Sequence, residues 1–179
     1  DFNQAWYQKG LPEIGDSIDE VVTFMSSEIE KRGITRVITV GTSAGGYAAL
    51  LFGCLLNADE VLAFGPQTFI DSQNREFYQD DRWTQKITAL YREMGQQAKF
   101  FDLKLVLKDY SNIRTKFKLY FDRTHQLDNS HANHIQNCSN VELFAYEEGG
   151  HSIVRLMRDR GILKSILLDS VIKKSDLLD

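Results

Sequence analysis

The apolar residues near the start of the chain have a helical spacing, and a short, uninterrupted apolar run that is typical of a strand follows them. Over residues 18–29 the apolar side chains fall at i, i+3, i+4, i+7 and i+11, which predicts one buried face of a helix. Ser17, with Glu20 three residues later, has the form of a capping box, and Gly33 stands where this helix would end. The run Val37–Val40 is short, β-branched and uncharged, which is typical of a strand buried on both faces in a parallel sheet. The pattern therefore predicts a helix followed by a buried strand.

The same alternation continues to the end of the chain. Residues 44–56 are apolar all round, which predicts a helix packed on most of its sides. Residues 67–82 are polar and predict no regular element. We expect further strands at 61–64, 116–121 and 141–145, and helices within 83–110, at 129–137 and from 152 to about 174 with a break at Gly161. Strands that alternate with helices predict an α/β fold, a mostly parallel sheet of about four or five strands with helices on both faces.

Composition is that of an ordinary folded protein. Of the 179 residues, 42% are hydrophobic and 26% are charged, and because no repeat, low-complexity tract or linker interrupts residues 1–179 we expect a single domain. The net charge of −4 gives no basic footprint for nucleic acid. No apolar run approaches the ~20 residues that span a bilayer. Since the first residues also lack the pattern of a signal peptide, we expect a cytoplasmic protein.

Cysteines and histidines give no sign of a metal site. Cys54 and Cys138 lie in unrelated contexts without a metal-type partner at short spacing, and we expect two free thiols in or near a core. His131 and His134 stand three residues apart on the predicted helix 129–137, where we expect surface or half-buried side chains. We therefore predict no metal and no cofactor. His125 lies in the loop before that helix and could line a site.

The segment RVITVGTSAGG, residues 36–46, places a serine between a predicted strand and a predicted helix. A strand, a tight turn and a helix with serine at the apex predict a nucleophile elbow. We expect small residues two places before and after the serine, here Gly41 and Gly45, because larger side chains there would strike the strand or the helix. Such a turn lifts the Ser43 hydroxyl above the carboxyl ends of the strands. It also points the backbone N–H of Ala44, at the start of a helix, toward a developing oxyanion.

A serine hydroxyl needs a general base, and the base needs a carboxylate to orient it. At this kind of turn the three residues follow in the order Ser, Asp or Glu, His. His151 follows the last predicted strand on a glycine-rich loop, so we assign it as the base. The acid should come from the loop after strand 116–121. We prefer Asp128, whose plain structural alternative is a helix N-cap; the other candidate is Asp122, which stands beside a potential ion-pair partner, Arg123.

These segments resemble the α/β-hydrolase superfamily, which includes serine esterases and lipases. The resemblance rests on VITVGTSAGGYAALLFG, on the acidic loop after KFKLYF and on GGH before the last helix, and it covers the C-terminal half of such a fold. It implies that the stretch 65–69 lines the pocket, where Phe64 and Gln67 would contact substrate. The roles it implies for the other residues are Ser43 as nucleophile, His151 as base, Asp128 or Asp122 as acid and the N–H of Ala44 as an oxyanion donor.

The N-terminal part departs from the family pattern. Members of the superfamily usually have several strands before the helix that leads to the elbow, and the loop after one of those strands donates a second oxyanion N–H. Here only the stretch DFNQAWYQKGLPEIG precedes that helix. We therefore expect either a trimmed sheet or a fragment that lacks the first strands, and the sequence does not identify a second donor.

Together these observations predict a carboxylesterase-like serine hydrolase that cleaves an ester or related acyl bond of a small-molecule substrate through an acyl-enzyme. Two alternatives stay open. An acyltransferase would use the same triad, and a catalytically silent domain of the same fold would serve in binding or assembly. Exposed sheet edges favour such pairing and would also allow a homo-oligomer. A nucleotide-binding loop is disfavoured because no lysine follows the glycines as in a P-loop.

Overall fold

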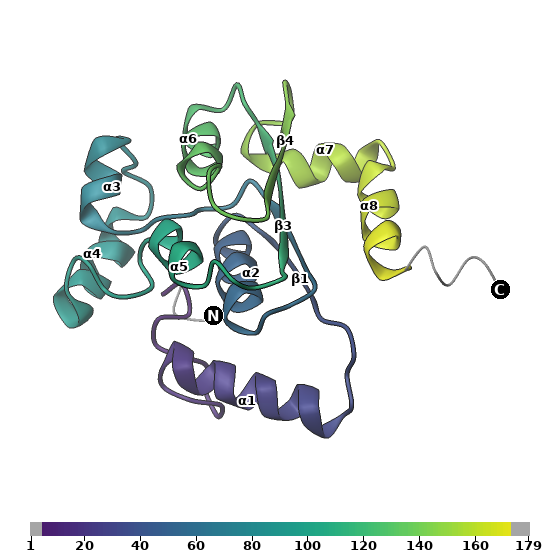
Figure 1. The fold of residues 1–179 in the computed structure, drawn as a ribbon. Helices are drawn as coiled ribbons and strands as arrows, with labels where there is room; N and C mark the ends of the chain where they lie inside the picture. The colour runs from purple at the N-terminus through teal and green to yellow at the C-terminus, as the bar shows by residue number, and fades with distance from the viewer. Residues whose placement is uncertain (1–4, 173–179) are drawn as a thin grey trace.

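A single parallel sheet forms the centre of the computed structural model, which describes residues 5–172. Within that range the sheet has four strands in the order β1-β2-β3-β4 (Figure 1): β1 Ile38–Thr42, β2 Glu60–Phe64, β3 Lys116–Asp122 and β4 Val141–Tyr146. Thr42 pairs with Phe64 and Phe64 with Tyr120, so the carboxyl ends of the strands lie along one edge. The predicted α/β fold is confirmed, and this edge is where such sheets place their sites.

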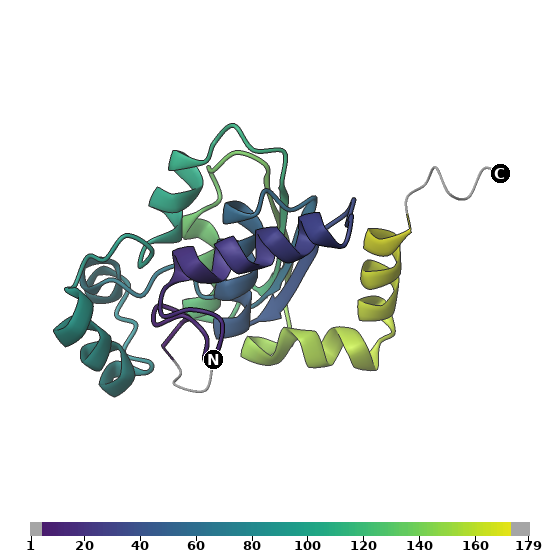
Figure 2. The same ribbon diagram turned by 90° about the horizontal axis from the view of Figure 1, so that it is seen from below.

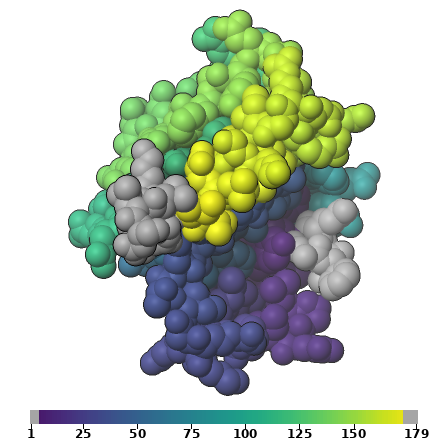
Figure 3. All heavy atoms as spheres, turned by 90° about the vertical axis from the view of Figure 1, so that its right-hand side faces the viewer, coloured from purple at the N-terminus to yellow at the C-terminus, as the bar shows by residue number. Residues whose placement is uncertain are grey.

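Helices cover both faces of the sheet (Figures 1 and 2). The larger core lies on one face and receives side chains from α1, α2, α4, α5 and α6, while the smaller core lies on the other face beneath α7 and α8. The space-filling view of Figure 3 shows the two C-terminal helices, in yellow-green and yellow, lying across that second face. The helices are α1 Ile18–Lys31, α2 Ala44–Leu55, α3 Ser72–Phe77, α4 Thr84–Met94, α5 Leu103–Asp109, α6 Gln126–His134, α7 Ile153–Asp159 and α8 Ile162–Val171, with a short 3₁₀ turn at Gly150–Ser152 before α7.

Strand β1 does not meet the expectation that it is buried on both faces. Val40 is 52% exposed, whereas every residue of β2 is buried. The reason is position: in the described part of the chain β1 is an edge strand with β2 as its neighbour, and β2 is covered on both sides by strands. The apolar run 61–64 therefore indicates burial correctly, and the apolar run 37–40 before Ser43 does not.

Two further elements differ from their predicted bounds. The polar segment 67–82 contains α3, which the sequence pattern did not predict because the helix buries none of its residues. Its N-cap Asp71 accepts a hydrogen bond from the N–H of Asn74 (2.9 Å). Helix α6 begins at Gln126 rather than at 129, with His125 as its N-cap, so Asp128 lies in the first turn of the helix and not before it.

Other local predictions agree with the structure. Ser17 caps α1 and accepts a hydrogen bond from the N–H of Glu20 (3.2 Å). Cys54 and Cys138 are buried free thiols in the larger core. None of the helices within residues 5–172 has both the length and the apolar character that crossing a membrane requires.

Candidate active site

Ser43 sits in a sharp turn between β1 and α2. Its backbone adopts φ 53° and ψ −121°, a conformation that costs energy for any residue with a Cβ and persists only where the surroundings enforce it. The N–H of Ser43 donates to the carbonyl of Phe64 (3.0 Å), and its own carbonyl accepts from the N–H groups of Tyr47 (3.0 Å) and Gln67 (3.3 Å). The end of β2 and the first turn of α2 thus hold the serine in place.

Glycines allow this turn, though not at both predicted positions. A Cβ at Gly41 would lie 2.0 Å from the carbonyl oxygen of Gly45, and one at Gly46 would lie 2.8 Å from the Cβ of Pro66. At Gly45 an added Cβ meets nothing within 4 Å, so the expected clash there was wrong. The helix turns position 45 outward, and position 46 makes the close approach to the chain after β2.

The structure brings Ser43, His151 and Asp128 into one hydrogen-bonded row. His151 Nε2 lies 2.9 Å from Ser43 Oγ, and His151 Nδ1 lies 2.9 and 3.0 Å from the two oxygens of Asp128. A carboxylate only accepts, so Nδ1 carries the proton that His151 donates to Asp128. Nε2 is then the unprotonated nitrogen that accepts the hydrogen bond from the serine hydroxyl.

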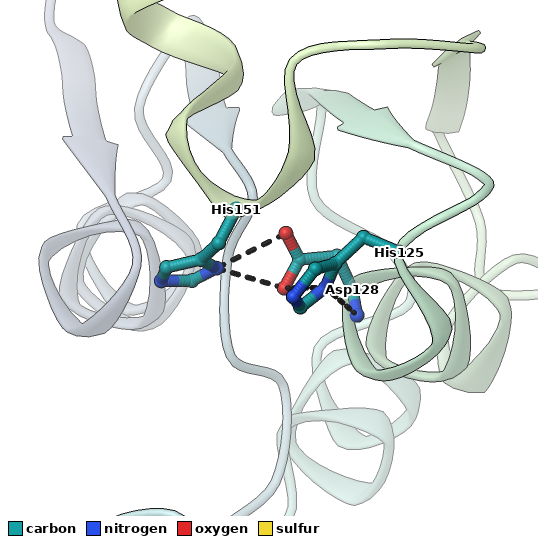
Figure 4. A group of neighbouring side chains, drawn as sticks. All are labelled: His125, Asp128 and His151. Carbon is teal, nitrogen blue, oxygen red and sulfur yellow. Dashed lines mark hydrogen bonds and ion pairs between the residues drawn. The ribbon is translucent and has the colours of Figure 1, made fainter.

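Asp128 is fully buried and lies in the first turn of α6. The N-cap His125 accepts the N–H of Asp128 at Nδ1 (3.3 Å), and its ring centre lies 5.7 Å from that of His151. Figure 4 shows His125 and His151 on either side of the carboxylate. Ligand atoms of these three residues lie within 4.8 Å of one another, close enough to hold a metal ion. The hydrogen bonds between His151 and Asp128 occupy the same atoms.

Asp122, the other acid candidate, holds the loop that carries His151. Its carboxylate accepts from the N–H of Gly150 (2.7 Å) and from the N–H and hydroxyl of Thr124 (2.8 and 2.7 Å). Burial alone raises the pKa of this carboxyl, but the hydrogen bonds from Thr124 and Gly150 outweigh it and hold the pKa below its ordinary value. Asp122 therefore stays an ionised anchor for the glycine loop, and Asp128 contacts the imidazole.

Gly65 packs directly behind the histidine–carboxylate pair. Its φ is +49°, and an added Cβ would lie 3.1 Å from Asp128 Oδ2 and 3.7 Å from His151 Nδ1. Glycine adopts this positive φ without strain, and a Cβ here would press against the Asp128 carboxylate. The family resemblance implied that the stretch 65–69, which includes Gly65, lines the pocket, but no local pattern indicated the contact of Gly65 with Asp128.

Gln67 and Phe64 are both buried, 1% exposed each. Gln67 accepts a hydrogen bond from Trp6 Nε1 at its side-chain oxygen (2.7 Å), and its buried side-chain nitrogen has no partner among the described residues. Phe64 stacks on Tyr120 with ring centres 5.0 Å apart, in the smaller core. Contact of either residue with substrate stays a prediction.

His131 and His134 are buried, which corrects the expected surface or half-buried location. His131 Nε2 pairs with Asp80 (3.0 Å) and His134 Nε2 pairs with Asp102 (2.7 Å). The carboxylates come from a distant stretch of the chain, so nothing local predicted the burial. Sequence reasoning also missed Arg82, whose Nη1 lies 3.5 Å from Asp128 Oδ1.

A cavity of about 670 Å³ lies at the other end of the sheet from Ser43. It is lined by charges of both signs at the start of the strands, among them Glu60, Lys116 and Lys118. The Lys118 ammonium and the Glu60 carboxylate form an ion pair there (2.6 Å). The arrangement around Ser43 is therefore defined by its hydrogen bonds and not by this cavity.

Comparison with known proteins relates the chain to others by structure. No protein-family model matches the chain, and no curated protein sequence matches it. The meta-cleavage product hydrolase from Pseudomonas fluorescens has a similar structure, with a TM-score of 0.57 and 10% identity over 90% of this chain and 74% of that one. Carboxyl esterase 2 from Tuber melanosporum has a TM-score of 0.54 and 14% identity, over 84% of this chain and 58% of that one. A lipase-esterase related protein from Clostridium acetobutylicum has a TM-score of 0.50 and 16% identity, over 83% of this chain and 72% of that one.

At these identities the likeness shows the fold. The chain has an α/β-hydrolase-like fold, with a strained serine at the carboxyl edge of its sheet, as the sequence resemblance implied.

Proposed function

We propose that the protein is a serine hydrolase that cleaves an ester or related acyl bond through an acyl-enzyme. One observation carries this proposal: Ser43 Oγ, His151 and Asp128 form a continuous row of hydrogen bonds at a strained strand–helix turn. Serine, imidazole and carboxylate in this order are the groups that activate a hydroxyl for acyl transfer. The fold, shared with hydrolases and esterases, is consistent with it.

In the proposed first step the Ser43 oxygen attacks the carbonyl carbon of the substrate while its proton moves to Nε2 of His151. Asp128, which accepts from Nδ1, stabilises the imidazolium that forms and keeps the ring in the productive tautomer. The negative charge on the carbonyl oxygen develops near the N–H of Ala44. That N–H belongs to the first residue of α2 and has no carbonyl one turn earlier in the helix to bond.

Collapse of the tetrahedral intermediate breaks the bond to the leaving alcohol, which takes the proton from His151. Water then attacks the acyl-serine, again losing a proton to His151, and the second collapse returns the proton to Ser43 and releases the acid. An acyltransferase would differ only in the nucleophile of the second stage, an alcohol instead of water.

The test is pre-steady-state hydrolysis of p-nitrophenyl acetate. We expect a burst of p-nitrophenol equal to the enzyme concentration or a steady turnover, in either case abolished in Ser43→Ala and retained in Ser26→Ala, an exposed serine on α1. Release that is the same in Ser43→Ala would overturn the proposal. If a folded protein releases none, the catalytically silent domain is the better description. Added alcohol acceptors separate the acyltransferase, because their esters would then accumulate in place of acetate.

A further inference from the structure

A second histidine–carboxylate pair lies behind the candidate triad. His131 and Asp80 are 0% and 2% exposed, and His131 Nε2 lies 3.0 Å from Asp80 Oδ2. The N–H of Thr68 donates to His131 Nδ1 (3.0 Å). Since Nδ1 accepts, Nε2 carries the proton and donates it to Asp80. The pair is therefore a fixed donor–acceptor unit that joins α6 to the chain before α4.

Asp80 in turn holds Arg82 by both of its oxygens. Oδ1 accepts from Arg82 Nε (2.9 Å) and from the Arg82 backbone N–H (3.0 Å), and Oδ2 accepts from Nη2 (2.8 Å). This fork is the geometry in which arginine and a carboxylate bind most specifically. It leaves Nη1 directed at Asp128, 3.5 Å from Oδ1, the oxygen that lies 2.9 Å from His151 Nδ1.

The charges in this row alternate and stay fixed. Burial alone raises the pKa of the Asp80 carboxyl, but hydrogen bonds from His131 and Arg82 outweigh it and hold the pKa well below its ordinary value. Burial lowers the pKa of His131 to about 4, so at neutral pH the imidazole is neutral and the charges are Asp80⁻, Arg82⁺ and Asp128⁻. The Arg82 guanidinium thus faces Asp128 on one side, and the carboxylate of Asp80, which balances its charge, lies on the other side.

We propose that Arg82, held by Asp80 and His131, is the positioning residue of the candidate triad: its guanidinium fixes the Asp128 carboxylate against His151 and sets the charge balance at that imidazole. This inference rests on the proposed function for its consequence in catalysis, but the placement of the charges stands on the contacts alone. Two opposite effects follow. Removing Arg82 leaves Asp128 less restrained and its negative charge less balanced, which favours the imidazolium of His151. Removing the charge of Asp80 leaves Arg82 uncompensated, which disfavours the imidazolium.

The experiment is an NMR titration of the His151 ring, assigned by its loss in His151→Gln, combined with kcat/KM against pH. We expect the pKa of His151 to rise by about 0.5 in Arg82→Gln and to fall by a similar amount in Asp80→Asn, the scale of a partly offset charge several ångströms away. In Arg82→Gln we expect kcat/KM to fall about tenfold to a hundredfold, because a reacting group is misplaced. Arg82→Lys, which keeps the cation without the fork, should leave the pKa of His151 closer to that of the wild type.

A matched control comes from the same helix. Asp102→Asn removes the charge of the carboxylate that pairs with His134. This partly buried pair holds α6 to the same distant stretch of the chain without an ion pair to Asp128. The Asp102→Asn variant should leave the pKa of His151 unchanged. The other groups facing the ring are Asp128, His125 at 5.7 Å and, through Gly150, Asp122. Each variant is therefore repeated with His125→Gln, so that titration of His125 is not mistaken for that of His151.

The outcomes separate the two proposals. Opposite pKa shifts in Arg82→Gln and Asp80→Asn support the positioning role, whether or not the protein hydrolyses esters, because the titration needs no turnover. Shifts of the same sign, or equal shifts in Asp102→Asn, would show that the network acts only by stabilising α6 and would overturn it. A protein without Ser43-dependent turnover would overturn the proposed function alone.

Discussion

Ser43 occupies a backbone conformation that residues with a Cβ rarely adopt, and contacts with neighbouring residues hold it there. Hydrogen bonds to Phe64, Tyr47 and Gln67 fix the peptide groups on both sides of it. The contact of Gly41 with Gly45 brings the start of α2 against the end of β1. At the scale of single residues, the site therefore depends on glycines, which have no side chain, as much as on Ser43, His151 and Asp128.

The two glycines beside the serine should respond differently to alanine. Gly41→Ala places a Cβ 2.0 Å from a backbone oxygen that cannot move independently, so we expect a loss of stability of about 1–3 kcal/mol or more together with loss of hydrolysis. Gly45→Ala places its Cβ in open space within a helix, where alanine is favoured. We expect its activity and melting temperature to stay close to the wild type. Equal effects of the two changes, by calorimetry and ester hydrolysis, would contradict this account of the turn.

Asp122, the last residue of β3, and Asp128, in the first turn of α6, should also differ in how far their replacement lowers activity. Asp128→Asn removes the acceptor that keeps the imidazole in its tautomer, and we expect kcat/KM to fall about 10⁴-fold, the scale known for a triad carboxylate. Asp122→Asn keeps an oxygen that can accept from Gly150, so we expect a loss of about tenfold or less, in line with one weakened hydrogen bond. Steady-state kinetics decide between them, and a larger loss in Asp122→Asn would reverse the assignment of the acid.

At the scale of elements, α6 connects the site to the rest of the molecule. It carries Asp128 in its first turn, and two histidine–carboxylate pairs, the buried His131–Asp80 and the partly buried His134–Asp102, join its later turns to the chain between β2 and β3. Buried polar groups that are fully paired fix an element in a single position. The long connection after β2 is thereby held against the helix that carries Asp128, the proposed triad acid.

The His131 pair should make stability depend on pH. Burial lowers the pKa of His131 from 6.5 to about 4, so as pH falls between these values the unfolded chain binds a proton that the folded chain does not. The free energy of unfolding should therefore be fully retained above pH ~6.5 and decrease as pH falls toward about 4. The lowered pKa of Asp80 acts in the same direction at still lower pH.

Chemical denaturation of the wild type and of His131→Gln between about pH 7 and pH 5 measures this slope. The variant should be less stable at pH 7 and show a flatter dependence on pH. His134→Gln is the matched comparison on the same helix. An unchanged slope in His131→Gln would place the pH dependence elsewhere.

Three stacked aromatic rings join the neighbouring strands β2, β3 and β4. Phe64 stacks on Tyr120 (5.0 Å) and Tyr120 on Phe144 (4.7 Å). We expect Phe64→Ala to cost about 3–5 kcal/mol of stability, as for other buried aromatic residues, and Phe64→Leu to cost less. Thermal unfolding and kinetics on the leucine variant test this. A selective rise in KM without loss of stability would show that the ring contacts substrate.

At the scale of the whole molecule, the site exists only in the folded chain. Ser43 and His151 are 108 residues apart in sequence, and the parallel sheet brings the ends of β1, β3 and β4 to one edge, where the loops that carry the three residues meet. The general tendency of α/β proteins to place their sites at the carboxyl ends of the strands therefore accounts for the arrangement.

Much of this arrangement could be predicted from the sequence, because it depends on strong local signals. The buried run of β2, the caps of α1 and the strand–Gly–x–Ser–x–Gly–helix pattern each specify structure within a few residues. Contacts between distant segments left no such signal. Asp80 and Arg82 lie in a polar stretch without periodicity, and the burial of His131 depends on them. The exposure of Val40 reflects the place of β1 in the sheet, which a short apolar run cannot reveal.

Covalent labelling with a fluorophosphonate, followed by peptide mass spectrometry, tests the central claim most directly, because the reagent requires an activated serine hydroxyl. The account predicts one phosphonate adduct on the peptide that contains Ser43, absent in Ser43→Ala, greatly slowed in His151→Ala and unchanged in Ser26→Ala. An adduct on another residue, or a folded wild-type protein that takes up none, would contradict it.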